Sequence, residues 1–176
     1  MLSKDRILNL LEQLNLALND RGEIGEIGLV GGAVMCVVYN ARVATKNVDA
    51  IFEPATILRE LAGQIAERES LPPDWLNDAA KDYILSGFAK QEVISLSNLR
   101  VWAPEPRYML AMKCISARWD NSDRDDVIFL IRHLKIILPN EVFKIIESYY
   151  PQDKIPTKTK FFIEEVLQDE GKESET

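Results

Sequence analysis

Two glycines and a pair of polar residues further along the chain form its most chemically suggestive arrangement. Gly31 and Gly32 stand at a predicted junction between a strand and a helix, and fourteen residues separate Gly32 from Asn47. A turn without Cβ atoms lets the backbone approach phosphate groups closely. Side chains alternate along a strand, so Asn47 and Asp49 point to the same face and can share one Mg²⁺ ion. The spacing therefore predicts a site for a metal-bound triphosphate.

The amide at position 47 leaves two interpretations of this site open. The Asn47 amide oxygen can coordinate a cation, but an aspartate there would add a negative charge beside a polyanion. Without that negative charge, the free energy of metal binding is weaker by several kcal/mol, which is the scale of an unbalanced charge in a half-buried site. Either the site is active although it binds Mg²⁺ more weakly, or this chain is an inactive relative that binds its ligand without turnover.

Composition restricts the class of partner. The chain has 176 residues and a net charge of −7, which suits one buried domain or a small core with a helical appendage. An acidic chain is disfavoured as a general nucleic-acid binder, although one local basic surface is not excluded. The charged N-terminus and the lack of a long apolar run predict a cytoplasmic protein with no membrane partner.

The cysteines and the histidine exclude several chemistries. Cys36 and Cys114 both fall in apolar helical patterns, which predicts buried thiols and not a disulfide. His133 is the single histidine, so a histidine metal site or a catalytic triad has too few members.

The elements that must position the polar residues follow from apolar periodicity and turn residues. Helices are expected at 4–20, 31–38, 55–69, 75–80, 104–118, 123–138, 140–150 and 159–167, and strands at 26–30, 47–52, 92–96 and 99–102. This order predicts an α+β fold with a small mixed sheet, an N-terminal helix and a C-terminal helical half. We expect a core at 1–102, a helical region packed on it at 103–168 and a disordered tail at 169–176.

At this point the chain resembles a known fold family. The diglycine turn, the following helix and the strand carrying Asp49 resemble the minimal polymerase-β-type nucleotidyltransferases, and in particular the first motif of the AbiEii-type abortive-infection toxins. A closer resemblance is to a bacterial nucleotidyltransferase-like family of unassigned function. It rests on the stretch at 42–50, on Leu-Pro-Pro-Asp-Trp-Leu-Asn-Asp-Ala at 71–79, and on further segments at 104–113, 123–127 and 149–151.

The resemblance implies Mg²⁺-dependent transfer of a nucleoside monophosphate from an NTP to an unknown acceptor. It implies that the diglycine cradles the phosphates and that Asn47 and Asp49 hold the metal. It also implies that Asp49 and Lys113 are the catalytic residues, with Lys113 facing the nucleotide. The remaining residues that it assigns to nucleotide binding or to support of the site are Arg42, Thr45, Arg118 and Asp126. A third carboxylate is expected on a neighbouring strand, where Glu92 is the nearby candidate.

Several of these residues also have a plain structural interpretation. Lys113 lies among apolar neighbours and can simply pair with Asp126, whereas Asp123 fits a helix-capping role near a helix N-terminus. Trp75 is expected to anchor its turn more than to stack on a base. His133 is expected to be a partly exposed structural residue.

Three functions therefore remain in competition. The first is a nucleotidyltransferase, with a toxin or defence role and an antitoxin or another protein as partner. The second is a nucleotide-binding protein without turnover, and the third is an interaction protein that docks a partner on its C-terminal helices.

Overall fold

The computed structural model describes residues 1–79, 81, 84, 87–116 and 121–173. The chain divides into two compact units. The first unit comprises residues 1–84 and 90–104, and the second comprises 85–89 and 105–176. The division after Pro104 falls two residues beyond the predicted boundary at 102, and the short segment 85–89 belongs to the second unit.

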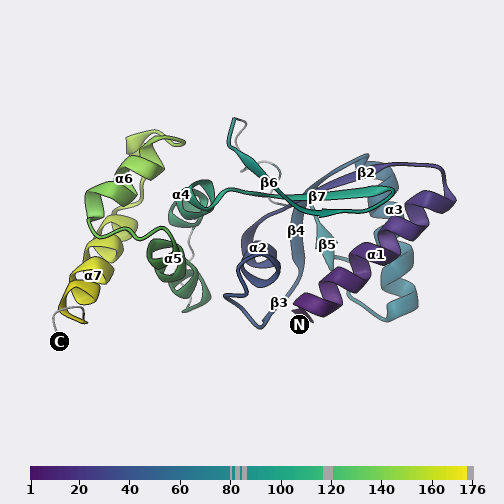
Figure 1. Cartoon of the computed structure of the whole chain (residues 1–176), viewed down its shortest axis with the longest axis horizontal. Coiled ribbons are helices and arrows are strands. Elements are labelled where there is room, and N and C mark those ends of the chain that lie inside the picture. The colour runs from purple at the N-terminus through teal and green to yellow at the C-terminus, as the bar shows by residue number, and fades with distance from the viewer. Residues whose placement is uncertain (80, 82–83, 85–86, 117–120, 174–176) are drawn as a thin grey trace. The chain divides into compact units, whose positions relative to one another are not determined.

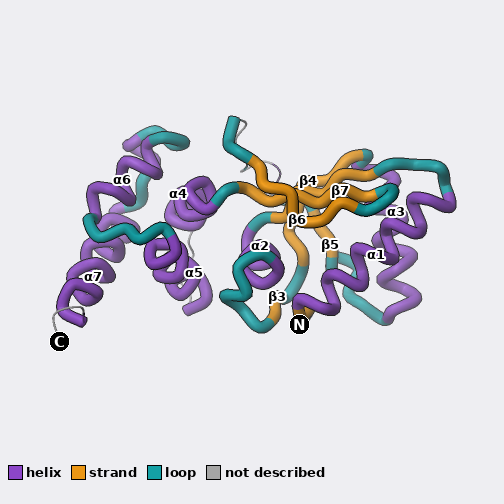
Figure 2. The backbone as a smooth tube through the Cα atoms, viewed as in Figure 1, coloured by secondary structure: helices purple, strands orange, loops and turns teal. Residues whose placement is uncertain are grey.

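The first unit is built on a mixed sheet of five strands (Figure 2). Its elements are β1 (Leu2–Ser3), α1 (Lys4–Asp20), β2 (Gly25–Leu29), α2 (Gly31–Val37), β3 (Ala44–Thr45), β4 (Val48–Glu53), α3 (Ala55–Glu69), β5 (Leu76–Asn77), β6 (Lys90–Ser95) and β7 (Leu99–Pro104). The strand order is β5-β4-β2-β7-β6, while β1 and β3 pair separately. β2 is antiparallel to β4 and parallel to β7. The α+β class predicted from the sequence is confirmed.

One face of this sheet carries the hydrophobic core. Ile27 and Leu29 on β2 lie opposite Phe52 and Ala50 on β4, and all four are buried. A Cβ atom on Gly25, on the same face, would meet side chains of Leu18 in α1 and Leu58 in α3. Figure 1 shows α1, α2 and α3 on this side of the sheet. We call the other side, to which Glu26, Gly28, Asp49, Ile51 and Trp102 belong, the open face.

A side-chain cap begins the first helix, and an apolar stripe packs it. The Ser3 hydroxyl accepts a hydrogen bond from the Arg6 amide, which caps α1. The helix buries its leucine stripe, including Leu10, Leu14 and Leu18, against the sheet and α3.

The prediction of a helix at 75–80 is wrong for residues 75–79, the part of it that the structure describes. Leu76 and Asn77 instead form β5, which pairs in parallel with Val48 and Asp49. The short apolar segment does not complete a helical turn because the backbone oxygen of Trp75 accepts a hydrogen bond from the Val48 amide. A strand partner outside the local sequence therefore decided the conformation.

The second unit is helical. It contains α4 (Pro106–Ser116), α5 (Asn121–His133), α6 (Pro139–Glu147), a 3₁₀ turn (Gln152–Lys154) and α7 (Thr157–Glu173). α4 is its centre, since residues 108–114 are all buried and both α5 and α6 contact it. The Thr159 hydroxyl at the start of α7 donates a 2.8 Å hydrogen bond to the backbone oxygen of Cys114.

The largest differences from the sequence prediction in this unit are the C-terminal ends of α5 and α7. α5 stops at His133 and not at Leu138, because Lys135 adopts a left-handed conformation with φ of 55°. α7 continues to Glu173, so the tail predicted to be disordered is helical as far as the structure describes it. In the described part of the chain, no helix has the combined length and apolarity needed to cross a membrane.

Candidate functional site

The turn between β2 and α2 brings Gly31 against Asp49. Gly31 has φ of +58°, a conformation that glycine adopts without the penalty of a Cβ atom. A Cβ placed there would lie 3.4 Å from Oδ2 of Asp49. The backbone also ties the two segments together, since the Val30 amide donates to the Asp49 backbone oxygen at 2.9 Å. The carboxylate and the turn therefore converge, as the sequence predicted.

Gly32 is packed even more tightly against the loop that follows α2. A Cβ on Gly32 would lie 2.8 Å from the Thr45 hydroxyl oxygen and 3.3 Å from Nη1 of Arg42. Thr45 is 6% exposed and belongs to β3, which pairs with the N-terminal strand β1. The glycine thus gives a hydroxyl donor and a guanidinium close access to the backbone.

The Asn47 and Asp49 side chains lie next to each other beside this turn. Asn47 Nδ2 donates a long hydrogen bond of 3.4 Å to Oδ1 of Asp49, and both residues are half-buried. Within the described residues, this is the single hydrogen bond that reaches the Asp49 carboxylate. We call the set Gly31, Gly32, Arg42, Thr45, Asn47 and Asp49 the diglycine corner.

The neighbour of Asp49 on the next strand is an amide. Asn77 on β5 pairs with Asp49 in parallel register and faces the same side of the sheet. Its Oδ1 accepts from the Ala79 amide at 3.1 Å, which stabilises the turn after β5. The following residue, Asp78, is paired with Arg59, and this hydrogen bond lowers the pKa of the Asp78 carboxyl.

Glu92 was expected near Asp49, and that expectation is wrong. Glu92 lies on β6, an edge strand, and two strands separate β6 from β4. At about 4.8 Å between neighbouring strands, the two backbones are on the order of 14 Å apart. The hairpin was correctly predicted, but the parallel pairing of β7 with β2 carries it away from β4.

The donor set of the corner fits one Mg²⁺ ion held jointly with phosphates. Mg²⁺ is usually bound through one or two carboxylates together with substrate phosphates and water. The corner offers the Asp49 carboxylate and, after rotation of the amide, the Asn47 oxygen. No cluster of three or more His, Cys, Asp or Glu side chains is placed to hold a metal ion among the residues the structure describes.

Lys113 belongs to the second unit and has a different environment. It is 7% exposed, and its ammonium lies 2.7 Å from the Asp126 carboxylate and 3.0 Å from Asp123. Asp126 is 1% exposed. The structure shows the ion pair with Asp126 that the sequence left open as the alternative to nucleotide binding. Asp123 does more than the expected helix cap, because it supplies the second partner of the lysine.

The other residues singled out from the sequence are mostly structural. Arg118 lies outside the described residues. Trp75 is 1% exposed and donates from Nε1 to the Ala62 backbone oxygen, so it anchors its turn as predicted. His133 is exposed and stacks on Phe129. Both cysteines are free and buried, and burial raises the pKa of the Cys114 thiol to about 12.

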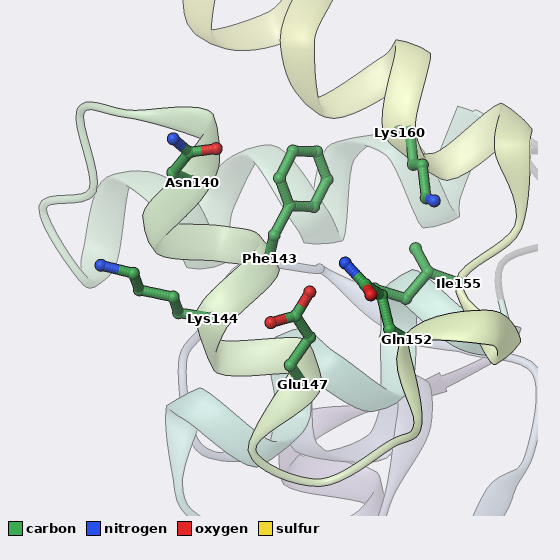
Figure 3. A pocket seen from close by; sticks show the side chains of 7 residues that line it. All are labelled: Asn140, Phe143, Lys144, Glu147, Gln152, Ile155 and Lys160. Atoms are coloured by element: carbon green, nitrogen blue, oxygen red, sulfur yellow. The ribbon is translucent and has the colours of Figure 1, made fainter.

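A small pocket in the second unit has no counterpart in the sequence prediction. It has a volume of about 280 Å³ and lies between α6, the 3₁₀ turn and α7 (Figure 3). Phe143 and Ile155 form its apolar part, and Lys144, Glu147 and Lys160 bring charges of both signs. No sequence signal pointed to it, because its lining residues come together only through helix packing.

Comparisons of the chain with models of protein families, with curated proteins and with solved structures gave no match. The functional conclusion therefore depends on the geometry of the corner and on the resemblance of its motifs.

Proposed function

We propose that the first unit binds the triphosphate of a nucleoside triphosphate, together with Mg²⁺, at the diglycine corner. The observation that carries the proposal is the approach of the Asp49 carboxylate to the positive-φ turn at Gly31, next to the Arg42 guanidinium at Gly32. A backbone free of Cβ atoms, a cation and a carboxylate in one half-exposed place suit a metal-bound polyphosphate.

The residues of the corner have separate roles in this proposal. Asp49 and the Asn47 amide oxygen hold the ion, the Arg42 guanidinium neutralises phosphate charge, and the Thr45 hydroxyl donates to a phosphate oxygen. When bound, Mg²⁺ supplies charge neutralisation at the phosphates. The Asn47 amide must rotate to present its oxygen, which gives up only the long hydrogen bond to Asp49.

We infer that this chain binds the nucleotide but transfers little of it to an acceptor. Transfer to a hydroxyl acceptor is helped by carboxylates that hold metal and activate the acceptor. Here the residue two before Asp49 and its register partner on β5 are the amides Asn47 and Asn77. A nucleotidyltransferase-like protein that binds more than it turns over is the function that this donor set favours.

Transfer of a nucleoside monophosphate remains the second candidate. It is favoured by one observation: Asn47 contacts Asp49 from the position that a paired aspartate would take. A toxin-like role with an antitoxin partner is a further proposal, which depends on the resemblance alone.

Calorimetry with Mg²⁺ and each of the four common NTPs tests the binding. We expect the native chain to bind, and Asp49→Asn to weaken binding by tenfold or more because the corner loses its one carboxylate. Absence of binding for every nucleotide would overturn the proposal. For transfer, α-labelled NTP is incubated with native protein and with Asn47→Asp; label incorporation only in the variant would show that the native site is disabled.

A further inference from the structure

Trp102 occupies an unusual position on the open face of the first unit. A Cβ on Gly28 would lie only 2.1 Å from Cζ2 and 2.3 Å from Cη2 of Trp102, so the indole lies directly against the glycine backbone. The indole Nε1 donates a 2.7 Å hydrogen bond to Glu26. The glycine below and the carboxylate at the edge hold the ring in one place.

The ring lies on the same face of the sheet as the Asp49 side chain of the diglycine corner. Trp102 and Ile51 are the register partners of Gly28 on either side, and Asp49 lies two residues from Ile51 along β4. One strand spacing and a two-residue rise place the Gly28 and Asp49 Cα atoms about 8 Å apart. A nucleoside attached to phosphates at Asp49 can span this separation.

We propose that Trp102 is the platform on which the base of the bound nucleoside triphosphate stacks; this inference rests on the proposed function. Aromatic side chains bind bases of any sequence because every base has a π face. The Lys90 ammonium lies 4.0 Å from the ring centroid, a cation–π contact that a stacking base would have to displace. The Lys90 side chain is 51% exposed, so it can move aside for a base.

The platform recognises a nucleoside as a class, and not a particular base. Among the described residues on this part of the open face, the ring of Trp102 and the aliphatic side chain of Ile51, which is half-buried, are the surfaces offered to a base. Neither reads a hydrogen-bonding edge, so affinity for the four nucleotides is expected to follow stacking area, with purines ahead of pyrimidines.

The test separates base stacking from phosphate binding by comparing Mg-ATP with Mg-tripolyphosphate. Trp102→Leu is expected to weaken ATP binding on the order of tenfold and to leave tripolyphosphate binding unchanged. Trp102→Phe keeps a ring and should retain most of the ATP affinity. Arg100→Gln, on the same strand and face but further from β4 Asp49, is the matched control and should change neither affinity.

Two outcomes overturn the platform. One is equal loss of both ligands in Trp102→Leu, and the other is no loss of either. If the native protein binds neither ligand, the proposed function fails, and the platform with it. Should Trp102→Leu not fold, tryptophan fluorescence of the native chain replaces it: ATP should quench the emission, tripolyphosphate should not, and Trp102→Phe should remove the quenching. Equal quenching by both ligands would contradict stacking.

Discussion

The sequence suggested a functional role for both the diglycine corner and the group of Lys113, Asp123 and Asp126, which we call the Lys113 cluster. The charges of the two sites are balanced very differently. At the corner, a half-buried carboxylate receives one long hydrogen bond from an amide, as far as the described residues show. In the second unit, one buried ammonium lies within 3.0 Å of two carboxylates. The Asp49 carboxylate has capacity for a cation, whereas the Asp123 and Asp126 carboxylates already share the Lys113 ammonium.

This difference supports the proposal that the corner, and not the cluster around Lys113, binds a ligand. A buried charge is tolerated when its partners are part of the fold, and removing a partner is then costly. A half-exposed charge with weak protein contacts is not neutralised by the fold, so a bound ligand of opposite charge can pair with it. The number of partners around a polar side chain therefore separates a structural cluster from a binding site more reliably than its residue types.

The largest expected effect follows from breaking the Lys113 cluster. Lys113→Met leaves Asp126 buried without its ammonium and should lower the free energy of unfolding by about 3–5 kcal/mol. Urea unfolding followed by circular dichroism measures this as a lower midpoint at an unchanged m-value.

The double variant Lys113→Met with Asp126→Leu removes the ammonium and the buried Asp126 carboxylate and leaves the less buried Asp123. It is the control, since it should recover a large part of the loss. If Lys113→Met kept native stability and instead lost nucleotide affinity, the lysine would be a binding residue and the contrast between the sites would fail.

Tight packing at the corner predicts the next effect. Gly32→Ala puts a Cβ atom within 2.8 Å of the buried Thr45 hydroxyl and should cost about 1–3 kcal/mol of stability. Gly63→Ala is the matched control, because nothing lies within 4 Å of a Cβ there and the residue is inside α3. Alanine in a helix should be stabilising by up to about 1 kcal/mol. Equal unfolding midpoints for the two variants would show that the corner is not closely packed.

Restoring a second carboxylate should sharpen the same contrast. Asn47→Asp is expected to tighten Mg-NTP binding on the order of tenfold, because the added charge favours the ion. In EDTA the variant should be slightly less stable than the native chain, since two adjacent carboxylates repel. Thermal unfolding with and without Mg²⁺ measures both effects. A variant that gained no Mg²⁺-dependent stability would indicate that residue 47 does not face the metal.

The local parts of this architecture could be predicted from the sequence. The sequence predicted β2, the diglycine turn and β4, the strand bearing Asp49, within one residue of where they lie. It could do so because side-chain alternation and turn residues act over short distances. The approach of Asp49 to the turn follows from the antiparallel pairing of two strands that are close in the chain.

What the sequence could not predict depends on long-range pairing. β5 has two residues and exists because it pairs with β4, so its local pattern was taken for a helix start. Likewise, the place of the β6–β7 hairpin in the sheet depends on the parallel pairing between β7 and β2. These pairings decide which side chains flank Asp49. Glu92 was expected beside it, but its neighbour on the next strand is Asn77.

The smallest expected effect tests that correction directly. Glu92→Gln should leave Mg-NTP affinity and Mg²⁺-dependent stability unchanged, because β2 and β7 lie between Glu92 and the strand of Asp49. Asn77→Asp is the informative partner, since its side chain is in register with Asp49 and a carboxylate there should strengthen Mg²⁺ binding severalfold. Calorimetric titration of Mg-ATP into both variants distinguishes them. A loss of affinity in Glu92→Gln with no gain in Asn77→Asp would place the third ligand on β6 after all, and the strand order would then be the wrong guide to the metal site.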